Sequence, residues 1–230
     1  MDCSSAVNNT DLITQADLDS GASDAKFISK NFFILAEESG TLRSSYLSEY
    51  GGNKFLKSFE AKQEHGGGVN CVELFSDKST AITGGADMRI KIWETESLRS
   101  KTTLYPAHSR EITSVSTHPE DCNVFLSTSL DVKCFLWDLR LEKPASLLDK
   151  NESGYGSICW LSENSVVLGH CTGCLSLYDI RMRNELDRNF CSEQKVHRLK
   201  FNPSLKVLAA CFENPTIHLL ECKNDLFNNV

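Results

Sequence analysis

Five segments of this chain end alike, and their spacing constrains the fold more than any other feature of the sequence. Each carries an apolar stretch that leads to a large residue, and in four of them an acidic residue follows. The large residues stand at positions 46, 93, 137, 178 and 220, so the period is 41 to 47 residues. The segments are Thr41–Leu47, Ile90–Glu94, Cys134–Asp138, Leu175–Asp179 and Ile217–Glu221. A fixed period of this length indicates an architecture in which each unit packs on its neighbours.

Short apolar runs with turn residues between them fill each period, and no long 3.6-residue periodicity interrupts them, which favours an all-β chain. The period and the Trp-Asp type of ending resemble the WD40 repeat. We therefore expect a WD40 β-propeller with about five recognisable four-stranded blades, at residues 23–62, 63–106, 107–150, 151–191 and 192–230. Residues 1–22 are polar and are predicted to be a flexible N-terminal segment. The fifth repeat is expected to lack its fourth strand.

A turn residue stands six positions before each large residue, in phase with the repeat. These residues are Gly40, Asp87, Asp131, Thr172 and Asn214. Glycine, aspartate and asparagine tolerate tight-turn geometry, and the acids can accept hydrogen bonds from nearby backbone amides. Only Thr172 is a weaker choice for such a turn.

Two blades carry a complete set of spaced polar residues. The sets are His65, Thr83, Asp87 and Trp93 in the second blade, and His108, Ser127, Asp131 and Trp137 in the third. The spacing predicts a buried chain from indole to hydroxyl to imidazole to carboxylate, in which every donor meets an acceptor. A catalytic Ser-His-Asp set would need an exposed oxygen and an oxyanion hole. We therefore predict structural networks, and we expect the other three blades to be held more by packing alone.

Charge and cysteine content limit the function classes. The formal net charge is -7, and no run of Lys and Arg suggests direct nucleic-acid binding. An acidic scaffold suits basic partners such as Arg-rich tails. The ten cysteines lie partly among apolar strand residues, and no signal peptide or membrane span is evident. We expect free thiols and a cytoplasmic or nuclear protein without a membrane role.

Two further motifs have structural and functional interpretations. The pair Cys171 and Cys174 is a lone CxxC without a second ligand pair, so a turn is favoured over a metal or redox site. Arg140 and Arg181 each follow a (Trp/Tyr)-Asp-x sequence in successive blades. They either cap strand ends and pair with a carboxylate on the adjacent blade, or form a docking pair for a cullin-type ubiquitin ligase. We predict no catalytic residue, no cofactor and no metal.

Residues 64–148 go beyond a general WD40 pattern. They include Thr83-Gly-Gly-Ala-Asp87, Val124-Phe-Leu-Ser127 and Lys143-Pro-Ala-Ser146. This stretch resembles the methylosome WD-repeat family, the propellers that accompany the type II protein arginine methyltransferase, and a weaker similarity extends from about residue 12 to 228. The divergence of the sequence would suit an insect relative that serves germ-plasm assembly.

The resemblance implies a non-catalytic scaffold or adaptor that binds the methyltransferase and helps to present Arg-rich histone and Sm protein tails. The alternative is a substrate receptor of a cullin-type ubiquitin ligase. Family members form seven blades, whereas five are recognisable here, and the aromatic anchor of the family's N-terminal extension matches no residue. The chain is therefore expected to be a fragment or short isoform, or else degenerate strands in residues 1–25 and 222–230 help to close the ring.

Overall fold

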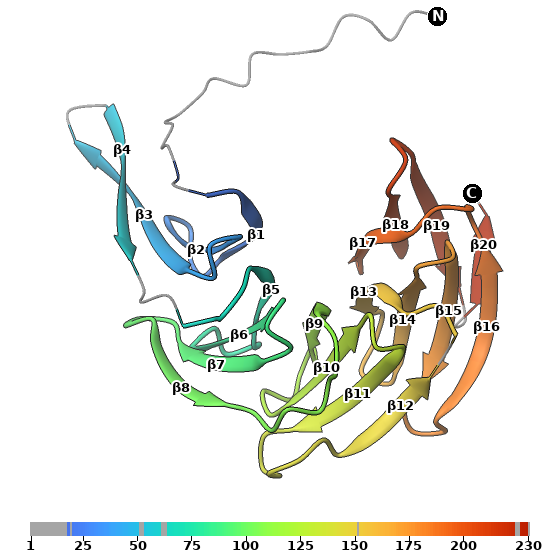
Figure 1. Ribbon diagram of the computed structural model, residues 1–230. Helices are drawn as coiled ribbons and strands as arrows, with labels where there is room; N and C mark the ends of the chain where they lie inside the picture. Colours follow the sequence, from blue (N-terminus) through green and yellow to red (C-terminus); the bar gives the residue numbers. More distant parts are fainter. Residues whose placement is uncertain are drawn as a thin grey trace, which may run out of the picture.

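The protein folds into five four-stranded antiparallel sheets in a ring, a five-blade β-propeller (Figure 1). The computed structural model describes residues 18, 20–50, 53–60, 64–150, 152–223 and 226–229. Most of the predicted flexible segment, residues 1–22, lies outside these ranges. The predicted all-β WD40 propeller class is confirmed.

The strands follow one another in sequence order within every sheet. The first sheet contains β1 (Ala22–Phe27), β2 (Phe32–Glu37), β3 (Leu42–Tyr50) and β4 (Asn53–Glu60). The second contains β5 (Val69–Leu74), β6 (Thr80–Gly85), β7 (Ile90–Glu94) and β8 (Arg99–Thr103). The third contains β9 (Ile112–Thr117), β10 (Val124–Ser129), β11 (Lys133–Asp138) and β12 (Ser146–Lys150).

The fourth sheet contains β13 (Tyr155–Trp160), β14 (Ser165–His170), β15 (Cys174–Asp179) and β16 (Asn184–Phe190). The fifth contains β17 (Val196–Asn202), β18 (Val207–Phe212), β19 (Ile217–Lys223) and β20 (Leu226–Asn229). The expectation that the fifth repeat lacks its fourth strand is wrong, because β20 pairs antiparallel with β19. The sequence of β20, Leu-Phe-Asn-Asn, is too short and polar to signal a strand by alternation alone.

The first strand of each sheet lines the centre of the ring, where β1, β5, β9, β13 and β17 succeed one another (Figure 1). The core lies between adjacent sheets, because the residues at alternate strand positions face the neighbouring blade. Trp93 and Trp137 are 1% and 2% exposed, and the Trp137 ring stacks on Phe125 with centroids 5.6 Å apart. Trp93 and Trp137 therefore act as buried anchors between adjacent blades, whereas Tyr46 of the first repeat is 42% exposed.

The predicted turn residues organise the connection between the second and third strands. Asp87 accepts a hydrogen bond from the Arg89 backbone N–H at 3.1 Å, and Asp131 accepts one from the Lys133 N–H at 3.2 Å. The residue between the acceptor and the donor is Met88 in the second blade, with a φ of 64°, and Val132 in the third blade, with a φ of 63°. Left-handed backbone is costly for these side chains, and the carboxylate bonds stabilise it.

The ring is open between the first and fifth sheets, whose outward faces have no neighbouring sheet in Figure 1. In β19, Ile217 and Leu219 are 66% and 57% exposed, whereas Leu220 is buried against the fourth sheet. In β1, Phe27 is 66% exposed and contacts Phe33 across the strand pair. These apolar side chains lie where a further blade would pack in a closed propeller.

Candidate functional site

The polar set of the second blade forms one continuous hydrogen-bonded chain. The Trp93 Nε1–H donates to Thr83 Oγ1 at 2.8 Å, and Thr83 Oγ1 lies 2.8 Å from His65 Nε2. Because the hydroxyl proton is free to point at the imidazole, His65 carries its proton on Nδ1, which donates to Asp87 Oδ1 at 2.9 Å. Asp87 Oδ2 accepts the Gly66 backbone N–H at 2.9 Å. Every polar group of the chain is thus satisfied.

The third blade repeats the arrangement with a more deeply buried carboxylate. Trp137 Nε1–H donates to Ser127 Oγ at 2.8 Å, and Ser127 Oγ lies 2.7 Å from His108 Nε2. Both oxygens of Asp131 lie 3.1 Å from His108 Nδ1, and Oδ2 accepts the Ser109 N–H at 2.9 Å. Ser127 is 0% exposed and its oxygen is fully engaged, so no substrate can reach it. The geometry supports a structural role for this set.

Burial lowers the pKa of His65 and of His108, against the opposing effect of the partner carboxylates. Desolvation of the imidazolium is the largest cause in both cases. Both imidazoles are therefore neutral in the folded protein near pH 7. A neutral imidazole with one donor and one acceptor matches the hydroxyl and carboxylate on its two sides.

The first and fourth blades lack the complete set, but they also contain buried polar pairs. In the fourth, His170 Nε2 lies 2.8 Å from Ser176 Oγ, and the Tyr155 hydroxyl donates to Asp149 Oδ2 at 2.5 Å. In the first, the buried Glu37 carboxylate accepts from Arg43 Nε at 2.5 Å. The signal for the fourth blade was Ser176, a polar residue in the apolar strand Leu175–Tyr178.

His170 is expected to make the fold sensitive to acid. Burial, and then the nearby Arg188 charge, lower its pKa from 6.5 to about 4. The unfolded chain binds a proton below pH 6.5 that the folded chain does not, so stability is full above pH 6.5 and falls toward pH 4. When the pH is lowered from 7 to 5, the free energy of unfolding of the parent falls. The free energy of unfolding of His170→Gln should fall by about 1–2 kcal/mol less.

Urea unfolding of both proteins at the two pH values measures this difference. His197, which is exposed at the start of β17, provides the matched control as His197→Gln. An equal loss of stability in the parent and in His170→Gln would contradict the assignment.

Arg140 and Arg181 lie at the ends of β11 and β15 with exposed side chains, 60% and 71% accessible. Arg140 makes two hydrogen bonds of 2.7 Å to Asp138, the acid of its own Trp-Asp ending, and lies 3.4 Å from Asp121 of the same sheet. Arg181 lies 3.7 Å from Asp179. The structural interpretation that they pair with an adjacent blade is wrong, because each pairs within its own blade.

The cysteines of the described ranges are all free. Burial raises the pKa of Cys71 to about 12 and that of Cys134 well above its usual range, so both behave as apolar core groups. Cys171 lies in the turn before β15 and Cys174 is the first residue of that strand. Within the described ranges no group of three His, Cys, Asp or Glu residues is arranged to hold a metal ion. No helix long and apolar enough to span a membrane occurs there either.

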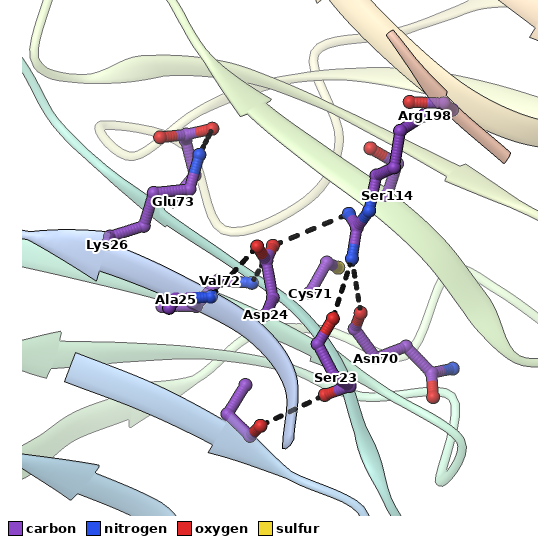
Figure 2. A network of polar contacts seen from close by, with 12 residues as sticks. Ser23, Asp24, Ala25, Lys26, Asn70, Cys71, Val72, Glu73, Ser114 and Arg198 are labelled. Atoms are coloured by element: carbon purple, nitrogen blue, oxygen red, sulfur yellow. Dashed lines mark hydrogen bonds and ion pairs between the residues drawn. The ribbon is translucent and has the colours of Figure 1, made fainter. Parts of the chain in front are cut away.

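An ion-pair cluster that the sequence did not reveal lies at the centre of the ring (Figure 2). Arg198 of β17 donates to the backbone oxygens of Ser23 at 3.0 Å and Asn70 at 3.4 Å, and lies 3.4 Å from the Asp24 carboxylate. It therefore joins the fifth sheet to the first and second, across 175 residues of sequence. No local motif could identify Arg198, because its partners come from distant sheets that meet only at the centre of the assembled fold.

A second ion pair extends this cluster along the same inner strands. Lys26 of β1 lies 2.6 Å from the Glu73 carboxylate of β5, and Lys200 of β17 lies 3.7 Å from it (Figure 2 shows Lys26 and Glu73). Charges from three sheets are thus paired around the ring centre. The cluster links the inner strands of these three sheets.

The family model for the WD domain, G-beta repeat, matches residues 53–94 and 99–138, the stretches that end at Trp93-Glu94 and Trp137-Asp138. These two stretches of the chain are therefore similar to the WD40 repeat. The two matched repeats are those that contain the complete Trp-to-Asp hydrogen-bonded networks.

This chain is also similar to a relative that matches most of its length. It is 29% identical over 210 residues to methylosome protein WDR77 of Xenopus laevis, which covers 88% of this chain and 62% of that protein. The resemblance to the methylosome WD-repeat family is therefore confirmed, at modest identity. The chain spans less than two thirds of that relative's length.

Other relatives match about half of the chain. A ribosome biogenesis protein WDR12 homolog of Arabidopsis thaliana is 30% identical over 107 residues, 45% of this chain and 25% of its own length. Eukaryotic translation initiation factor 3 subunit I of Drosophila yakuba is 25% identical over 130 residues, 51% of this chain and 39% of its own. These shorter matches reflect the shared WD40 repeat.

Proposed function

We propose that this chain is a non-catalytic scaffold subunit of a protein arginine methyltransferase complex. In this role it binds the type II methyltransferase and helps to present Arg-rich substrates such as histone or Sm protein tails. One observation carries the proposal. The similarity to the methylosome protein of Xenopus laevis extends along 88% of the chain, whereas the matches to the ribosome biogenesis and translation initiation proteins cover about half of it.

The chemistry of the described residues supports a scaffold. The hydroxyl, imidazole and carboxylate groups that resemble a catalytic set are used within the blades, where they bond to one another and to core tryptophans. The net charge of -7 favours association with basic segments. We also propose that the protein acts in the cytoplasm, the nucleus or both.

Co-expression with the cognate type II arginine methyltransferase, followed by size-exclusion chromatography, tests the proposal. We expect one complex that contains both proteins. A type I arginine methyltransferase, expressed in the same way, is the control and should elute separately. Separate elution of a folded, monodisperse chain from the type II enzyme would refute the scaffold assignment.

The second candidate is a substrate receptor of a cullin-type ubiquitin ligase. It is favoured by the exposed side chains of Arg140 and Arg181 at the ends of two successive blades. The double variant Arg140→Ala/Arg181→Ala separates the two candidates. If it abolishes capture of the ligase adaptor while the methyltransferase never co-elutes, the receptor function replaces the scaffold function. If all binding persists, both arginines are strand-end structure.

A further inference from the structure

A cavity of about 430 Å³ opens at one mouth of the ring centre, above the Arg198 cluster. Its walls come from all five sheets, with Glu38 from the first, Asn70 from the second, Glu111 and Thr113 from the third, Gly156 from the fourth and Lys195 before the fifth. This volume lies within the range of small-ligand sites. A site built from every blade exists only when the ring is assembled.

Two glutamates at this mouth have hydrogen-bonded backbones. Glu38 lies in the turn between β2 and β3, where its N–H donates to the Gly21 carbonyl at 2.8 Å. Glu111 directly precedes β9, and its carbonyl accepts the Leu130 N–H at 3.2 Å. Both side chains are exposed, and neither carboxylate has an ion pair or hydrogen bond to any residue in the described ranges.

The cations that line the cavity do not neutralise these two carboxylates. Arg198, which lines the cavity, is engaged with Ser23, Asn70 and Asp24 (Figure 2). Lys195 is the remaining lysine or arginine of the wall. The unpaired charged groups of the wall are therefore two carboxylates and one ammonium group. Their net negative charge favours a cationic ligand group.

We propose that this mouth binds an arginine side chain of an extended peptide between Glu38 and Glu111. A guanidinium offers five N–H donors in a plane and can serve two carboxylates at once, which the point charge of a lysine does less well. The ammonium of Lys195 is available to donate to a peptide carbonyl. The proposal deepens the scaffold function, and it rests on that function only in the choice of an Arg-rich peptide as ligand.

Fluorescence anisotropy with a labelled peptide of Arg-Gly repeats tests the site on the chain alone. Glu38→Gln/Glu111→Gln should weaken binding by about fivefold or more, the sum expected for two exposed ion pairs. A peptide with citrulline in place of each arginine has the same shape without the charge and should bind as weakly to the parent as the arginine peptide binds to the variant.

The matched control variant is Glu120→Gln/Glu163→Gln. These exposed acids lie at the opposite ends of the inner strands, after β9 and β13, where His118 Nε2 donates to the Glu163 carbonyl at 2.9 Å. The control removes the same charge and should bind the peptide within twofold of the parent. Equal weakening in both variants would show that the peptide binds through the overall negative charge of the chain, which would overturn the proposed site. Unchanged binding by Glu38→Gln/Glu111→Gln would also overturn the proposal.

Two further outcomes separate this inference from the scaffold function. A lysine-for-arginine peptide that binds as tightly would overturn the preference for arginine. Co-elution of Glu38→Gln/Glu111→Gln with the methyltransferase, together with lost peptide binding, would support the site and the scaffold independently. If the parent binds the peptide through these glutamates but never co-elutes with the methyltransferase, the site stands and the scaffold function fails.

Discussion

Replacement of Gly156 by alanine should destabilise the propeller by about 3 kcal/mol, the upper range for an overpacked interior. Gly156 lies in β13 at the contact between the fourth and fifth sheets. A Cβ there would stand 1.8 Å from the carbonyl oxygen of Val196 in β17. The clash is with backbone, so neither a rotamer change nor a flexible side chain can relieve it, and the inner strands would have to separate.

Separation of these strands would also affect a bond that spans the two sheets. The Leu199 N–H of β17 donates to Ser157 Oγ of β13 at 3.1 Å, one residue from Gly156. A thermal melt measures the effect, with an expected fall in Tm of roughly 6–12 °C for a chain of this size.

Gly66→Ala is the matched control for this substitution. Its Cβ would meet the Asp87 side chain at 3.8 Å, an ordinary van der Waals contact. The control should change Tm by less than about 2 °C. If Gly156→Ala has the same Tm as the parent, the close approach of Gly156 to the Val196 carbonyl is contradicted.

The repeat period and the Trp-to-Asp spacing allowed the blades to be predicted, because each feature repeats along the chain and depends on local geometry. The strand endings at Trp93 and Trp137 are examples. The spacing also predicted which eight residues form the two hydrogen-bonded networks. What local sequence could not provide was contact between distant strands. Arg198 pairs with Asp24 only because the ring brings β17 to β1, and Gly156 matters only because β17 lies against it.

The unpredicted polar groups have the same physical origin. Glu37 and Arg43 lie six residues apart and pair across a hairpin whose register had to be known first. The Tyr155 hydroxyl donates a hydrogen bond to Asp149 across the junction between two repeats. In both cases the sequence gives the residue types, and the paired geometry comes from sheet assembly. The cavity at the ring centre has no sequence signature, since its residues are distributed over all five repeats.

Replacement of Asp131 by alanine should lower the free energy of unfolding by about 3 kcal/mol, toward the upper end of roughly 1–3 kcal/mol for a lost buried acceptor. Asp131 is 7% exposed and accepts from the His108 imidazole and from the backbone N–H groups of Ser109 and Lys133. Alanine leaves these donors without a partner in a site that water reaches poorly. The lost Lys133 bond also removes support for the left-handed Val132.

Two related variants separate the network from a general effect of removing an acid. Asp131→Asn keeps an oxygen for the His108 N–H and should recover part of the loss. Asp87→Ala should cost less than Asp131→Ala, because the Asp87 side chain is 10% exposed and that of Asp131 is 2% exposed. Urea unfolding with an unchanged m-value measures all three. Equal stability of Asp131→Ala and the parent would refute the network, whereas equal losses in the alanine and asparagine variants would assign the effect to the backbone bonds rather than to the imidazole.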